Sequence, residues 1–97
     1  MPEVMFRVRW PDGAVESCYS PSTVITRFFE PGHDYPLEDF LTRARNGLNA
    51  ASDRVAQRYG GSGCSHARAQ LAAIEAKAIE TKARGQSGLV RIEGFAE

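Results

Sequence analysis

The sequence of 97 residues lacks most of the patterns that mark catalytic, metal-binding or nucleic-acid-binding proteins. It contains two cysteines and two histidines, without the paired Cys-x-x-Cys or His spacing of a zinc site. Twelve basic residues balance twelve acidic residues. A zero net charge argues against a nucleic-acid partner and against an anionic membrane surface. We therefore expect no bound metal, no cofactor, no nucleic acid and no membrane partner.

Long apolar runs are also missing. The chain begins MPEVMFRVRW, in which charged residues interrupt each apolar stretch, so we expect neither a secretory signal nor a membrane-spanning segment. A cytoplasmic protein is the expectation, and there Cys18 and Cys64 would be free thiols rather than a disulfide. The length predicts a single domain over residues 1–97, with one core and no deep cleft between lobes.

The clearest positive signal is a β-hairpin near the N-terminus. Apolar residues alternate from Val4 to Trp10, and Pro11-Asp12-Gly13 follows as a turn. Proline cannot donate a hydrogen bond across the hairpin, so a two-residue turn is disfavoured, and a type I turn with a left-handed glycine bulge fits better. In that register Trp10 faces Ala14, Val8 faces Glu16 and Phe6 faces Cys18, while the outer sheet face carries Arg7, Arg9, Val15, Ser17 and Tyr19.

Two helices and a final strand follow. Apolar residues recur at three- and four-residue spacing from Leu37 to Tyr59, and two apolar stripes run along a second helix that begins at Ser62 or Ser65 and ends near Arg84. Residues 89–95 read as a strand with Val90 and Ile92 inward. The predicted fold class is α+β, a two-layer protein in which a three-stranded sheet, made of the N-terminal hairpin and the C-terminal strand, is covered by an antiparallel helix pair. Strand order stays open, as does a helical or extended state for residues 21–29.

Several short segments resemble a known family. RWPDG at residues 9–13, CYSPS at 18–22, the later Pro31-Gly32, Tyr35 and Phe40, and Cys64-Ser65 at a helix start are similar to the small nitrogen-starvation response family. That family is encoded in bacterial gene clusters beside a nitrilase, a radical SAM protein, a flavin-dependent oxidoreductase, an acetyltransferase and a purine-synthase-like protein. The resemblance implies a role in using nitrile or cyanide nitrogen. It brings no assigned activity, ligand or catalytic residue.

Three features could carry chemistry, and each has a structural alternative that we favour. Cys64 and His66 at a helix start could form a reactive thiol site, or bind a metal with Cys18 or His33, but a buried structural cysteine is the simpler reading. The glycine-rich residues 60–63 could cradle a phosphate, although a linker is favoured. Lastly, the outer-face cluster Arg7, Arg9, Arg91 and Tyr19 has the composition of a nucleic-acid platform, yet a solvated face is favoured.

Two hypotheses about function follow. The favoured one is a non-catalytic accessory or interaction protein of a bacterial nitrogen-starvation response, which forms a homodimer and works with the enzymes of its gene cluster. Its predicted interface consists of Gly47 on the first helix and Ala72, Ala76 and Ile79 on the second. The alternative is a small thiol-dependent enzyme or carrier that uses Cys64 at a helix N-terminus, with His66 beside it.

Overall fold

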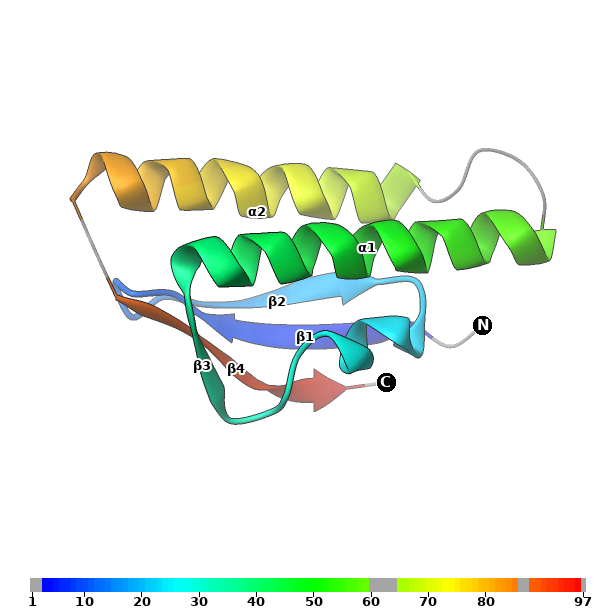
Figure 1. The fold of residues 1–97 in the computed structure, drawn as a ribbon, viewed down its shortest axis with the longest axis horizontal. Helices are drawn as coiled ribbons and strands as arrows, with labels where there is room; N and C mark the ends of the chain where they lie inside the picture. The colour runs from blue at the N-terminus through cyan, green and yellow to red at the C-terminus, as the bar shows by residue number, and fades with distance from the viewer. Residues whose placement is uncertain (1–2, 60–64, 86–87, 97) are drawn as a thin grey trace.

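A sheet and two long helices form the two layers of this α+β fold (Figure 1). The computed structural model describes residues 3–59, 65–85 and 88–96. Both helices cover the same face of the sheet and run in opposite directions, so the other sheet face is open (Figure 1). The elements in chain order are β1 (Val4–Arg9), β2 (Val15–Ser20), the 3-10 helix η1 (Thr23–Arg27), β3 (His33–Pro36), α1 (Leu37–Tyr59), α2 (Ser65–Ala83) and β4 (Leu89–Ala96).

The sheet has four antiparallel strands in the order β2-β1-β4-β3, and the prediction of three strands is corrected by the addition of β3. Residues 34–36, directly before the first helix, do not begin that helix. They instead extend along β4, where Tyr35 pairs with Val90 and Asp34 pairs with Arg91. Pro36 is the last residue of this edge strand, where a missing backbone donor costs no internal ladder bond.

The predicted hairpin register is confirmed. Phe6 pairs with Cys18 and Val8 pairs with Glu16. The Trp10 N–H donates to the Ala14 carbonyl over 2.8 Å, and Gly13 has a φ of +90°, as the bulged turn requires. Alternate residues of β1 consequently enter the core, whereas Arg7 and Arg9 stand on the open face.

Residues 21–29, which the sequence left open, are mainly a short 3-10 helix. Ser22 begins it, and its side-chain oxygen accepts a hydrogen bond from the Val24 N–H over 3.2 Å. Arg43 of α1 fixes the C-terminal end of η1, because its guanidinium donates a hydrogen bond to the Phe28 carbonyl over 2.9 Å. The same guanidinium forms an ion pair with Asp39. This segment closes one side of a core whose aromatic members are Phe6, Trp10, Phe29, Tyr35 and Phe40.

The second helix lies along β2, the edge strand opposite β3. The Tyr19 N–H, which points out of the sheet edge, donates to Gln70 Oε1 over 2.9 Å, and Lys77 forms an ion pair with Asp12 in the hairpin turn over 2.9 Å. On the inner side of α2, Ala67, Ile74 and Ala78 are buried. The helix ends before Gly85, whose φ of +70° is the left-handed conformation expected after a helix C-terminus. Among the described residues, no helix is long and apolar enough to cross a membrane.

Candidate functional site

His66 is the residue of the predicted thiol site that the structure describes. Cys64 and the glycine-rich residues 60–63 lie outside the described residues. The roles predicted for them therefore stay predictions. His66 is exposed on the first turn of α2 and meets the ring of Tyr19 edge-on, with 5.4 Å between ring centroids. Ser65 and His66 are thus placed near the end of β2 by the packing of α2 along that strand.

The other candidate metal ligands are separated by the sheet order. His33 is on the edge strand β3, where it packs against Tyr35 at 4.6 Å between centroids, whereas Cys18 is on the opposite edge strand β2. In the described ranges, no group of three His, Cys, Asp or Glu side chains is placed to hold a metal ion. Cys18 and His33, the two alternative partners predicted for Cys64 and His66, therefore lie on opposite edge strands of the sheet.

Cys18 is a core thiol. It is 2% exposed beneath the helices, and burial raises the pKa of its thiol to about 12, with a smaller contribution from Glu16. A thiol of that pKa is protonated at neutral pH, so Cys18 is a poor nucleophile and a poor metal ligand in the folded protein. The sequence-based expectation that this residue belongs to the core is confirmed.

Charged side chains on the open sheet face form a partly neutralised cluster. Arg9 Nε lies 2.5 Å from Glu93 Oε1, and Arg91 lies 3.3 Å from Asp34. The hydrogen bond from Arg9, with the charges of Arg91 and Arg7, lowers the pKa of the Glu93 carboxyl below its ordinary value. Two of the three arginines predicted on this face are therefore engaged in ion pairs.

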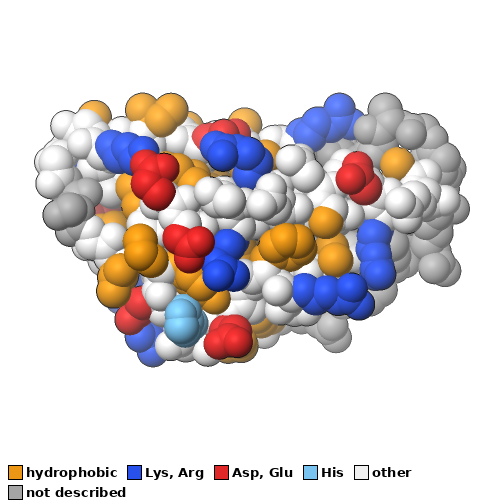
Figure 2. Space-filling model, in the orientation of Figure 1, with side chains coloured by type: hydrophobic (Ala, Val, Ile, Leu, Met, Phe, Trp, Pro, Cys, Tyr) orange, Lys and Arg blue, Asp and Glu red, His pale blue; other side chains and the backbone are white. Residues whose placement is uncertain are grey.

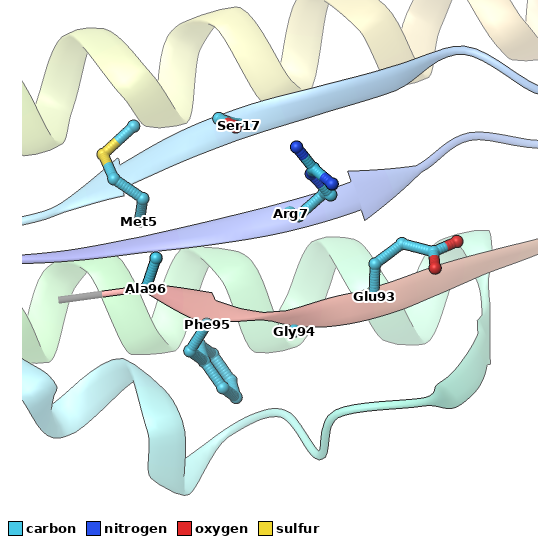
Figure 3. A pocket seen from close by; sticks show the side chains of 7 residues that line it. All are labelled: Met5, Arg7, Ser17, Glu93, Gly94, Phe95 and Ala96. Carbon is cyan, nitrogen blue, oxygen red and sulfur yellow. The ribbon is translucent and has the colours of Figure 1, made fainter.

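The same face contains a shallow hollow that the sequence analysis missed. Its volume is about 430 Å³, and it lies over β1 and the bulged part of β4, where Arg7 pairs with Gly94 but Val8 pairs with Ile92. Met5 and Ala96 stand at one end, and Arg7 and Glu93 stand at the other (Figure 3). Among the residues that line the hollow, only Gly94 gave a signal in the sequence, because an isolated glycine in a strand often marks a β-bulge.

The helix layer presents an apolar outer stripe, defined here as Ala72, Ala76, Ile79 and Ala83 of α2. All four are exposed, and Ile79 is 69% exposed, the largest value among the described large hydrophobic residues. Orange side chains over α2 are visible along the upper margin of the molecule, with charged side chains beside them (Figure 2). The sequence predicted two stripes on this helix, and this one lies opposite the buried stripe.

Gly47, the remaining predicted interface residue, is buried within the chain. A Cβ atom added there would lie 2.5 Å from Ile25 Cδ1 and 3.3 Å from the ring of Phe28, so the glycine allows η1 to pack closely on α1. The element that approaches Gly47 is therefore η1 of the same chain. Of the four predicted interface residues, Ala72, Ala76 and Ile79 are exposed and Gly47 is not.

Comparison with known proteins supports one relationship. No curated protein and no solved structure matches the chain. A family model described as nitrogen starvation-induced protein NitG matches residues 5–95, which include every strand and helix of the fold apart from the first residue of β1 and the last of β4. The chain therefore belongs to the family of the nitrogen starvation-induced protein NitG.

Proposed function

We propose that this protein is a non-catalytic accessory protein of the bacterial nitrogen-starvation response, and that it acts as a homodimer joined through the outer stripe of α2. Membership of the NitG family supports the physiological setting. The observation that carries the proposal is the exposure of Ile79 at 69% in the middle of an alanine-rich helix face. Exposed apolar surface on a helix face is typical of protein contacts.

A second copy of the chain is the partner that we propose for this stripe. If two α2 helices paired antiparallel about a point midway between Ala72 and Ile79, Ile79 of each copy would lie against Ala72 of the other, so a large side chain would meet a small one. The chain carries no net charge, so long-range repulsion between copies does not oppose their association.

Membership of a nitrogen-starvation family also supports a wider role. We propose that the dimer supports enzymes that release nitrogen from nitriles or cyanide, encoded in the same gene cluster. The thiol-dependent alternative rests on Cys64, which is outside the described residues, and no described contact favours it.

Substitution of Ile79 by Asp in the host bacterium tests this proposal. We expect a strain carrying Ile79→Asp to grow like a strain lacking the protein when a nitrile is the nitrogen source, because a charge in the stripe opposes its burial. Leu89→Asp is the matched control, since Leu89 is also exposed, at 53%, but lies on β4 outside the stripe. Normal growth of the Ile79→Asp strain would show that the stripe is not needed, and normal growth without the protein would refute the nitrile setting.

A further inference from the structure

The open sheet face carries Arg7, which lines the hollow described above. Within the described part of the chain, Arg7 makes no hydrogen bond or ion pair, although Arg9 is bound to Glu93 and Arg91 is bound to Asp34. The three arginines and two carboxylates of this cluster therefore leave one positive charge in excess. Arg7 is exposed and lines the 430 Å³ hollow, so its guanidinium is accessible to a ligand.

The shape of the hollow comes from the bulge in β4. Gly94 lies directly across from Arg7, and a Cβ atom added at Gly94 would have no other atom within 4 Å. The hollow is thus open above the glycine backbone. A volume of about 430 Å³ lies within the range of roughly 300–1,000 Å³ that is usual for small-molecule sites.

The lining combines one polar end with one apolar end. Ser17 lies across from Arg7 on β2 and adds a hydroxyl group, while Met5 and Ala96, paired on adjacent strands, form the opposite end (Figure 3). A planar guanidinium matches the two oxygens of a carboxylate, and a single excess charge matches a monoanion better than a phosphate group. The Glu93 carboxylate in the wall is already neutralised by Arg9 at 2.5 Å.

We propose that this hollow binds a small monocarboxylate that carries a short apolar chain. The carboxylate contacts Arg7 and Ser17 above Gly94, and the apolar chain lies against Met5 and Ala96. This site is on the face opposite the helices, so it is independent of the dimer proposed above.

Titration with butyrate, followed by NMR on the full chain, tests the proposal, with butyramide as the neutral probe of the same shape. We expect saturable shifts of the Arg7, Ser17 and Gly94 signals with butyrate and not with butyramide. Arg7→Gln should weaken butyrate binding about tenfold or more, because a charge-assisted hydrogen bond is lost. Arg27→Gln removes an exposed arginine outside the hollow and should leave binding unchanged.

A second variant tests the hollow by filling it while the fold is kept. Gly94→Leu places a side chain into open space at a residue without a positive φ, so the fold should persist while the hollow is filled. We expect it to abolish the butyrate shifts and to leave self-association unchanged. Equal shifts with butyramide, undiminished binding by Arg7→Gln, or no saturable shift in the wild-type protein would each overturn the proposal.

Discussion

At the scale of single residues, the buried thiol of Cys18 shows how the core makes a cysteine unreactive. The fold covers this side chain almost completely and raises the pKa of its thiol from 9.0 to about 12. The neutral thiol is the form that an apolar core favours, because burial penalises the charged thiolate. The packing role that the hairpin register predicted for Cys18 therefore also explains why its thiol stays protonated.

Cys18 should make stability depend on pH in the alkaline range. The folded pKa lies above the unfolded value, so between pH 9 and pH 12 only the unfolded chain loses this proton and the free energy of unfolding falls. In a Cys64→Ser background, Cys18→Ala should remove that part of the decline. Urea unfolding at pH 8 and at pH 10 measures it, and an identical pH dependence in both proteins would contradict the assignment. Cys18 should also resist alkylation until the chain is unfolded.

Gly47 is the residue at which α1 and η1 are closest. Gly47→Ala should gain about 1 kcal/mol of helix propensity. It should lose about 1–3 kcal/mol to overpacking against Ile25, which is fully buried. A modest net destabilisation is therefore expected from urea unfolding.

The clash at Gly47 can be tested with a compensating change. Ile25→Val removes the Cδ1 atom that the new Cβ would approach, at its own cost of about 0.5–1.5 kcal/mol. The double variant should consequently be more stable than the sum of the single effects, by about 1 kcal/mol. Strict additivity would mean that the two residues do not conflict and that the contact has been assigned wrongly.

At the scale of elements, the sequence predicted what depends on local chemistry. The hairpin register followed from Pro11 and Gly13, and both long helices followed from apolar spacing. The strand β3 was missed because its four residues show no alternation and its extended form depends on pairing with β4. The hollow near Arg7 was missed for a similar reason, since a β-bulge is a property of two paired strands.

The contact between the hairpin turn and α2 is expected to weaken in acid. The Asp12 carboxylate accepts a hydrogen bond from the Ala14 N–H over 3.0 Å and pairs with Lys77. These interactions lower the pKa of Asp12, the bond from Ala14 most strongly, and Asp12 raises the pKa of Lys77. The carboxylate therefore stabilises the fold above its unfolded pKa, and this contribution is lost as the pH falls through the lowered folded pKa.

Asp12→Asn tests this link while keeping an oxygen acceptor for Ala14. It should be less stable than the wild-type protein at neutral pH, and the difference should shrink toward zero in acid. Asp53→Asn, which removes one exposed aspartate from α1, is the matched control for the change in charge. Thermal unfolding from pH 7 to pH 2 measures both variants. A difference that stays constant over this range would show that the ion pair does not link the turn to α2.

At the scale of the whole molecule, the two layers present different surfaces. The sheet face opposite the helices combines two internal ion pairs, a hollow and the exposed Arg7 with the exposed apolar side chains of Met5 and Val15. The helix layer presents the apolar outer stripe, with Ile79 at its centre. A protein of this size has one core, so an exposed isoleucine flanked by alanines gains stability only when a partner covers it.

Sedimentation analysis over a concentration series is the most direct test of association through the outer stripe. The wild-type protein should pass from monomer to dimer as its concentration rises, and Leu89→Asp should do the same. Ile79→Asp should stay monomeric with an unchanged circular dichroism spectrum, because the substituted side chain is already exposed in the single chain. A wild-type protein that remains monomeric at the highest concentration, or an Ile79→Asp variant that dimerises as strongly, would contradict the account.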